Sequence, residues 1–223
     1  MPTPADPAPE TPPRRRFLRQ AGVAGVAIAA IARADAALLA TPAIALGPFY
    51  PPRKPADADA DLSQVQGHAR RAQGTLLYVE GRVLDVDGRP IPGAELELWQ
   101  ANAFGRYLHP ADTDASGPLD PDFQGYGRLR ADADGRFRIK TIKPAPYGAR
   151  TPHIHFNVAA GGTRLTTQMF FADEPANARD GLYRWLSPEE QRASTAQFVE
   201  RTPAMESGAL AVAWEVVLRK GAT

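Results

Sequence analysis

A tyrosine, an arginine and two histidines lie within nine consecutive positions of this chain, in the stretch KPAPYGARTPHIHFNV. They are Tyr147, Arg150, His153 and His155, and the whole sequence contains only four histidines. Side chains one residue apart on a strand leave the same face, so the two imidazoles would stand side by side, as two ligands of one metal ion do. A His-x-His pair alone also fits a strand edge with ordinary hydrogen bonds.

The ligands that such a metal could find nearby are few. The chain has no cysteine, and no aspartate or glutamate lies close to the histidine pair in sequence. Tyrosine remains, from Tyr147 and from Tyr107 in the stretch NAFGRYLHP. A phenol with an ordinary pKa of about 10 is a poor ligand, but a ferric ion favours the phenolate strongly enough to deprotonate it. Two phenolates and two neutral imidazoles would offset most of the charge of iron(III).

Alternating apolar and polar residues predict the strands that must position these side chains. VEGRVLDV (79–86) and AELELWQA (94–101) have the period of half-buried strands, and the Asp-Gly and proline residues between them predict a hairpin. Four further stretches also predict strands: GRFRIKTI, HIHFNVAA, TRLTTQMFF and ALAVAWEVVLRK. The sequence thus predicts about five to seven strands or more. SPEEQRASTAQFVERT (187–202) predicts the one substantial helix, with Ser187 as its N-cap.

Many strands separated by turn residues indicate an all-β protein. We expect an antiparallel β-sandwich with few helices, whose long loops build the site. The length of 223 residues and a hydrophobic share of 43% suit one domain, which we assign to residues 35–223. In it, Trp99, Tyr126 and Trp185 are interpreted as core or loop-packing residues.

Residues 1–34 have the layout of an export signal. The basic stretch RRRFLRQ (14–20) precedes the small apolar run AGVAGVAIAAIA (21–32), and Ala32-Arg33-Ala34 has the form of a cleavage site. RRRFLR resembles the twin-arginine signal, which directs folded proteins out of the cytoplasm. We therefore expect a periplasmic or secreted protein without a stable membrane span once the signal is removed.

The charge balance and the motifs indicate a small-molecule partner. Five of the 26 basic residues and two of the 25 acidic ones precede Asp35, so the remaining chain is slightly acidic. Domains that bind nucleic acid usually carry a basic stripe, which argues against that partner here. Self-association into a homo-oligomer stays open.

Four motifs in order, WQANAFGRYLHP, PLDPDFQGYGR, TIKPAPYGARTPHIHF and LTTQMFF, resemble those of the intradiol ring-cleavage dioxygenases, the family of protocatechuate 3,4-dioxygenase and the catechol 1,2-dioxygenases. LGPFYPP, from Leu46, resembles the family's segment that precedes them. The resemblance implies that one iron(III) per chain is bound by Tyr107, Tyr147, His153 and His155. It also places the family's active-site arginine and glutamine on Arg150 and Gln168.

The activity implied by the resemblance is cleavage of a catechol ring between its two hydroxyl-bearing carbons, with both atoms of O2 entering a muconate-type product in aromatic catabolism. In that reaction Tyr147 would leave the metal and act as a base, Arg150 would stabilise negative charge, and Gln168 would hold an oxygen. A departure lies between Tyr147 and His153. The protocatechuate enzymes have a longer loop there with a tryptophan after the tyrosine, so the short GARTP predicts a different pocket wall.

Two alternatives to the dioxygenase remain at this point. An exported metal- or sugar-binding β-sandwich module without turnover would use the same fold and location. A copper protein would use the same two histidines, although the lack of cysteine and of a nearby methionine ligand argues against an electron-transfer copper centre.

Overall fold

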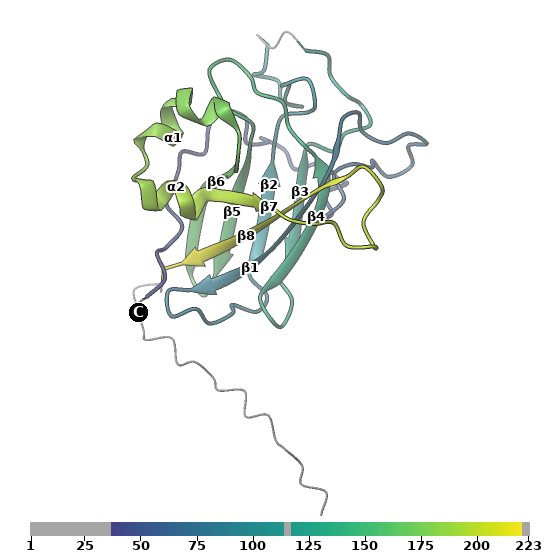
Figure 1. The fold of residues 1–223 in the computed structure, drawn as a ribbon. Helices are drawn as coiled ribbons and strands as arrows, with labels where there is room; N and C mark the ends of the chain where they lie inside the picture. The colour runs from purple at the N-terminus through teal and green to yellow at the C-terminus, as the bar shows by residue number, and fades with distance from the viewer. Residues whose placement is uncertain (1–36, 114–116, 220–223) are drawn as a thin grey trace, which may run out of the picture. The chain divides into compact units, whose positions relative to one another are not determined.

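The computed structural model describes residues 37–113 and 117–219, and the segment expected to form the export signal lies outside the described residues. Eight strands and three short helices follow one another along the chain (Figure 1). Their bounds are β1 Leu76–Asp85, β2 Glu95–Trp99, β3 Tyr126–Arg130, β4 Arg136–Ile142, β5 His153–Ala160, β6 Thr163–Phe171, the 3-10 helix η1 Pro175–Arg179, α1 Gly181–Trp185, α2 Pro188–Ser194, β7 Thr195–Phe198 and β8 Leu210–Leu218. The all-β class is thereby confirmed.

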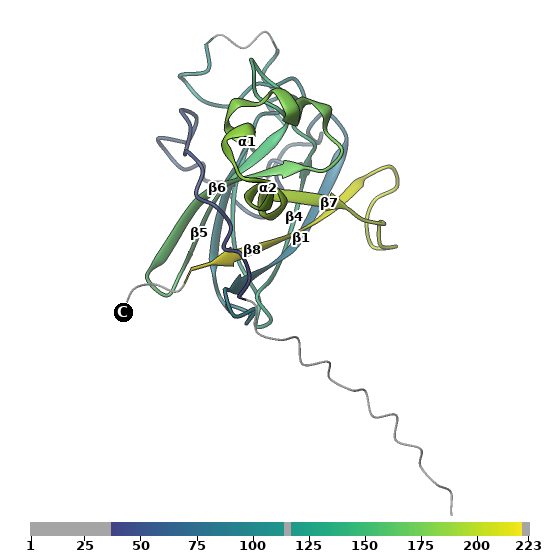
Figure 2. The ribbon, with the colours of Figure 1, turned by 60° about the vertical axis from the view of Figure 1, so that its left-hand side comes forward.

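All eight strands are hydrogen-bonded into one nearly closed, barrel-like sheet, in the order β3-β2-β5-β6-β7-β8-β1-β4. Most neighbours are antiparallel, but β1 pairs with β8 and β6 pairs with β7 in parallel. The short β7 joins the half made of β3, β2, β5 and β6 to the half made of β8, β1 and β4. In Figure 1, β1 and β8 cross in front of the other half, and in both views of the ribbon α1 and α2 lie together beside β6 and β7 (Figures 1 and 2).

The core lies between the two halves of the sheet and draws side chains from both. Fully buried examples are Val79 on β1, Ile139 on β4, Phe156 on β5 and Val216 on β8. Burying one such side chain contributes about 1.5–3 kcal/mol to folding. Because β5 supplies part of this core, its other face is free to carry polar side chains.

The predicted hairpin between β1 and β2 is wrong, because the two strands are not neighbours in the sheet. A tight turn does follow β1, and the N–H of Ile91 donates to the carbonyl of Val83 at 2.9 Å. Pro90 and Pro92 offer no N–H to continue this pairing. At Gly93, whose φ is 67°, the chain turns away, and β2 joins β3 and β5 instead.

The predicted helix over residues 187–202 is confirmed only in its first half. Ser187 caps α2 by accepting a hydrogen bond from the Glu190 N–H, and the Glu190 carboxylate accepts from the Ser187 N–H in return. The helix ends at Ser194, and the following residues form β7, in which Ala196 is fully buried. Pairing with β6 and β8 thus overrides the helical pattern. The helices η1 and α1 were not predicted.

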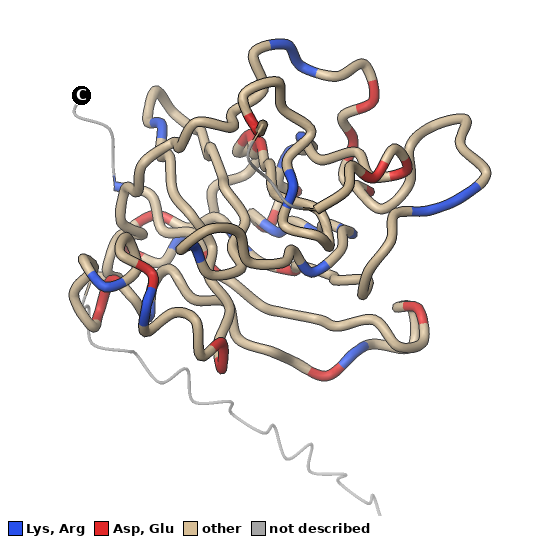
Figure 3. The backbone as a smooth tube through the Cα atoms, turned by 90° about the horizontal axis from the view of Figure 1, so that it is seen from above, with Lys and Arg blue, Asp and Glu red and all other residues tan. Residues whose placement is uncertain are grey.

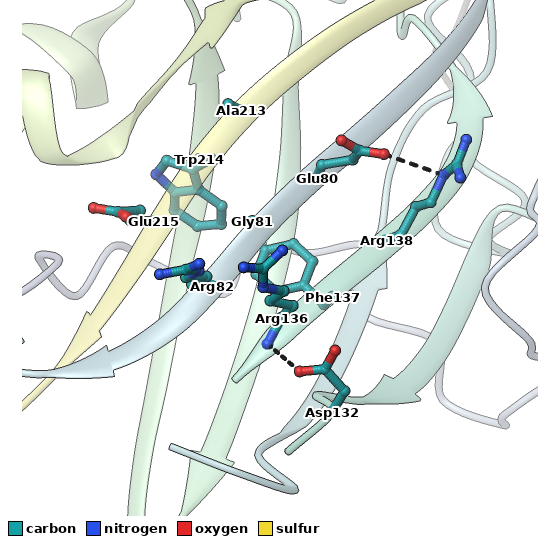
Figure 4. A pocket seen from close by; sticks show the side chains of 10 residues that line it. All are labelled: Glu80, Gly81, Arg82, Asp132, Arg136, Phe137, Arg138, Ala213, Trp214 and Glu215. Carbon is teal, nitrogen blue, oxygen red and sulfur yellow. Dashed lines mark hydrogen bonds and ion pairs between the residues drawn. The ribbon is translucent and has the colours of Figure 1, made fainter. Parts of the chain in front are cut away.

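A surface hollow of about 430 Å³ lies over β1, β4 and β8, away from the histidine pair (Figure 4). Its charged side chains have both signs, and Glu80 and Arg138 are paired at 3.3 Å. Gly81 lies between Phe137 and Trp214, and a Cβ at this position would meet the Trp214 carbonyl oxygen at 2.0 Å. This glycine therefore lets the Phe137 side chain and the backbone of β8 approach β1.

Basic and acidic residues alternate along the described backbone rather than gathering by sign (Figure 3). Lys140 illustrates the local pairing, because its amine contacts both Asp61 at 3.3 Å and Glu206 at 2.7 Å. Within residues 37–113 and 117–219, none of the helices has the length and apolar character needed to span a bilayer.

Candidate metal centre

Strand β5 holds His153 and His155 on the same face, as predicted. Between and beyond them, Ile154 and Phe156 point into the core and are fully buried. Pairing with β2 and β6 on both sides sets the register, so that His155 lies opposite both Trp99 and Gln168. The two imidazole Nε2 atoms face each other at 3.1 Å, and both rings are almost completely buried.

The environment of the histidines keeps both rings neutral. Burial, with a smaller effect of Arg150, lowers the pKa of His153 to about 3. Burial, followed by the charges of His153 and Arg150, also lowers the pKa of His155 well below its usual range. The Nδ1 of His153 lies 2.6 Å from the Thr151 carbonyl oxygen, which can only accept, so Nδ1 carries the proton. The Nε2 lone pair of His153 is therefore directed into the cluster, as a metal ligand requires.

Two loops bring the two tyrosines to the histidines. Tyr147 lies in a tight turn closed by two backbone hydrogen bonds with Arg150, and its hydroxyl is 3.5 Å from the His153 Nε2. Tyr107 is held through its backbone N–H, which donates to the Asp112 carboxylate at 2.6 Å. The two phenol rings are perpendicular, with centroids 5.3 Å apart. Four side chains that were singled out from the sequence thus form one cluster.

The two phenols are held in their neutral form, and a bound cation would be needed to ionise them. Burial raises the pKa of Tyr107 well above its ordinary range, and burial also raises the pKa of Tyr147, although nearby Arg150 opposes both shifts. The Tyr107 hydroxyl is buried without a hydrogen-bond partner of good geometry. Unsatisfied buried polar atoms are costly unless something binds them. Two neutral imidazoles and two phenols fit a ferric ion, which favours oxygen and nitrogen ligands and would deprotonate the phenols.

Arg150 and Gln168, the other two predicted site residues, are joined beside this cluster. A guanidinium N–H of Arg150 donates to the Gln168 amide oxygen, and the Gln168 amide donates to the Ala45 carbonyl oxygen at 2.8 Å. The Nε–H of Arg150 donates to the carboxylate of Asp180 at 2.8 Å. The guanidinium is therefore held at two points rather than exposed as a free cation.

Asp180 is a residue of the site that the sequence did not reveal. Its side chain is fully buried, and one oxygen accepts from Arg150 and from the Thr151 N–H at 2.9 Å. The other oxygen accepts from the N–H groups of Leu182 and Tyr183, which makes Asp180 the N-cap of α1. Asp180 lies 30 residues from Arg150, and no local pattern connects the two.

The segment LGPFYPP covers the cluster from outside. A Cβ on Gly47, whose φ is 75°, would lie 3.1 Å from the His155 ring. Phe49 stacks on Tyr107 with ring centroids 4.5 Å apart and meets Tyr147 edge-on at 5.9 Å. This segment therefore covers Tyr107 and one side of His155, whereas Tyr147 stays partly exposed.

Behind His155 lies Trp99, which was expected only to pack. The indole stacks on the His155 ring with centroids 4.8 Å apart and an angle of 13°. Next to it, Tyr50 and Tyr126 both donate to Glu97 at 2.7 Å. Burial alone would raise the pKa of Glu97, but these and other hydrogen bonds lower it to about 2. The strand β2 thus supports the orientation of His155 with a stacked ring and an ionised, fully bonded carboxylate.

Comparison with known proteins shows the family and supports a shared fold. A sequence profile of the family described as "Dioxygenase" matches residues 45–220. The protocatechuate 3,4-dioxygenase beta chain of Burkholderia cepacia is 37% identical over an alignment of 181 residues, which covers 77% of this chain and 76% of that one. A catechol 1,2-dioxygenase of Acinetobacter baylyi is 33% identical. The match covers 65% of this chain and 50% of the length of that enzyme. The solved dioxygenase domain of a dioxygenase–carbohydrate-binding fusion from Streptomyces sp. SirexAA-E is 30% identical, with a TM-score of 0.59 over 81% of this chain and 98% of that domain.

Replacing Asp180 with asparagine tests whether this carboxylate holds Arg150 and α1. Hydrogen bonds to charged groups contribute about 1.5–3 kcal/mol, so we expect Asp180→Asn to lower the free energy of unfolding by about 2 kcal/mol at pH 7, measured by chemical denaturation. Glu174→Gln is the matched control. The Glu174 carboxylate accepts one hydrogen bond, from the Lys143 amine at 3.3 Å, so this variant should lose less free energy of unfolding. Equal losses in the two variants would contradict this role.

The same comparison has a defined pH dependence. Burial would raise the pKa of Asp180, but hydrogen bonds from Thr151, Tyr183 and Arg150 lower it below the ordinary 3.8. A carboxyl with a lowered folded-state pKa stabilises the protein above its unfolded pKa and loses this effect as the pH falls through the folded value. The difference between wild type and Asp180→Asn should therefore be constant above about pH 5 and shrink below about pH 4.

Proposed function

The chain belongs to the intradiol ring-cleavage dioxygenases, a family of oxidoreductases that use non-haem iron(III), and from this membership we propose that its described cluster binds one ferric ion. The proposed ligands are Tyr107, Tyr147, His153 and His155. The proposed reaction cleaves a catechol-type ring between its two hydroxyl-bearing carbons and places both atoms of O2 in a muconate-type product.

One observation carries this proposal more than any other. Two imidazole Nε2 atoms lie 3.1 Å apart, with the Tyr147 hydroxyl 3.5 Å from one of them and the buried Tyr107 hydroxyl left without a good partner. Among the described residues, no group of three or more histidines and acids forms an alternative metal site. The relatives are named as dioxygenases, so an exported binding module without turnover and a copper protein are not favoured.

Bound iron(III) would hold both oxygens of a catecholate and make its ring carbon reactive toward O2. A catechol bound as a dianion would lose two protons. Tyr147, as a phenolate, is suited to accept one of them, and a hydroxide from solvent would take the other. Tyr147 is the less buried of the two phenols and lies in a short surface turn, whereas Tyr107 is enclosed by Phe49 and anchored at Asp112. We assign the exchangeable ligand and base to Tyr147 and the permanent ligand to Tyr107.

Arg150 and Gln168 supply polar groups on the substrate side of the cluster. The guanidinium is charged at any working pH and needs no proton transfer to stabilise an anion. Because Asp180 and Gln168 already fix its orientation, it costs little reorganisation when negative charge develops on the ring. Gln168 is held through Ala45 and can present its amide to an oxygen of the substrate.

The remaining sequence expectations are also proposals. We propose that residues 1–34 act as a twin-arginine export signal and that residues 35–223 form a single dioxygenase domain with a sandwich-like arrangement of its sheet. The stretch RRRFLR and the apolar run after it support the signal. The location would be periplasmic or extracellular, with a catechol-type molecule and O2 as partners.

The metal proposal predicts colour and a specific loss. Purified protein should contain about one iron per chain and absorb broadly in the visible, because phenolate-to-iron(III) charge transfer gives such bands. Tyr107→Phe should weaken iron binding and shift the band. Tyr78 is a buried tyrosine of β1 whose ring lies under Arg138, and Tyr78→Phe should change neither property. Metal analysis measures the iron content, and visible spectra measure the band. A colourless, fully active zinc or copper form would contradict the proposal.

The role of Arg150 predicts a selective kinetic defect. Arg150→Ala should keep iron, colour and the colour change on adding catechol without oxygen, and should lose turnover by roughly a hundredfold, as the loss of one preorganised donor typically does. Arg138→Ala, which breaks an exposed pair with Glu80, is the control. Anaerobic substrate titration followed by mixing with oxygen separates binding from reaction. A variant that reacts with oxygen at the parent rate would remove Arg150 from the mechanism.

The export proposal is tested in cells. Changing Arg14 and Arg15 to lysine should leave the precursor in the cytoplasm, whereas wild type should be processed near Ala34 and recovered outside it. Fractionation and mass spectrometry of the mature N-terminus measure both effects. Unchanged export of the lysine variant would refute the twin-arginine route.

A further inference from the structure

Trp185 is the most exposed large apolar side chain of the described residues, with 89% of its surface open to solvent. The expectation that it packs in the core or a loop is therefore wrong. It borders an open, mostly apolar hollow of about 380 Å³, together with Leu182, Gly181, Ala149 and Arg150. An engineered apolar cavity of about 150 Å³ already holds a benzene ring, so this hollow is large enough for an aromatic group.

The helix that presents Trp185 is fixed rather than loosely attached. Asp180 caps α1 at its start, and the Tyr183 ring packs edge-on against Phe170 with centroids 4.9 Å apart. The Tyr183 hydroxyl is also 3.2 Å from the Thr195 hydroxyl. Because the helix is anchored, only the side-chain torsions of Trp185 must be ordered when a planar ligand binds to the indole.

The hollow adjoins the proposed catalytic site at Arg150. This side chain forms part of the hollow's wall and also donates to Gln168, which lies opposite His155 in the sheet. The loop on this side of the site is short and has small side chains, because only Gly148 and Ala149 stand between Tyr147 and Arg150. A Cβ on Gly148 or on Gly181 would meet nothing within 4 Å.

We propose that Trp185 and Leu182 form a subsite for an aromatic substituent on the catechol ring. The inference rests on the proposed function and names its substrate class as aryl-substituted catechols. The diol would face the four clustered ligands, and the substituent would extend past Arg150 to stack on the indole. Offset stacking on tryptophan and contact with the planar guanidinium both suit an aromatic ring.

The test compares catechol with 4-phenylcatechol on the iron-loaded enzyme. Wild type should bind 4-phenylcatechol more tightly, and Trp185→Ala should raise its KM about tenfold, the lower limit for losing such an apolar contact. The kcat/KM for unsubstituted catechol should stay within about twofold. Trp185→Phe should recover most of the loss, and Val199→Ala, an exposed apolar residue outside the hollow, should behave as wild type.

A second measurement does not depend on turnover. Trp99 and Trp214 are buried, so acrylamide quenching of tryptophan fluorescence reports mainly on Trp185. Without oxygen, 4-phenylcatechol should protect this fluorescence from the quencher and unsubstituted catechol should not. The same titration in the visible gives the dissociation constants of both compounds.

The outcomes separate the two proposals. If catechol itself fails to change the visible spectrum, the proposed function fails and the inference falls with it. If catechol binds and is cleaved, but Trp185→Ala affects both compounds equally or neither, the subsite alone is overturned. A change in mass by light scattering on Trp185→Ala without a change in discrimination would likewise overturn it, and would assign Trp185 to contact between two copies of the chain.

Discussion

The two-residue period of strand β5 is the constraint on which the site depends. Ile154 and Phe156 are committed to the core, so His153 and His155 must leave the opposite face together. Slipping the strand by one residue would place imidazoles in the apolar interior and phenylalanine and isoleucine at the site. Pairing with β2 on one side and β6 on the other prevents that slip, and the same pairings bring Trp99 and Gln168 opposite His155.

Around this strand the charges are arranged so that the donors are neutral until a metal binds. The histidine pKa values are lowered and the tyrosine pKa values are raised, mainly by burial. The positive charge of Arg150 is matched by Asp180, whose pKa is lowered. Binding of a ferric ion would therefore release phenol protons, which makes metal affinity dependent on pH.

The parts of the site that lie close together in sequence could be predicted, and the parts joined only by the fold could not. His153 and His155 follow from strand periodicity, and Tyr147 and Arg150 lie in the same stretch. Asp180 reaches Arg150 from the N-cap position of α1, 30 residues away, and no local sequence pattern pairs the two. The prediction of a hairpin between β1 and β2 was wrong for a related reason. Turn residues specify a local bend, but they do not specify which strand becomes the next neighbour in the sheet.

The tight turn from Tyr147 to Arg150 has a consequence for speed. Its ends are joined by backbone hydrogen bonds in both directions, and Arg150 is tied to Asp180, so moving the loop would break several interactions at once. Turning the tyrosine about its own side-chain torsions would break far fewer. Rotamer changes of accessible side chains take picoseconds to nanoseconds, whereas loop motions extend to microseconds. If the Tyr147 phenol moves between its positions near and away from the cluster by side-chain rotation alone, these positions would reach equilibrium long before a substrate molecule dissociates.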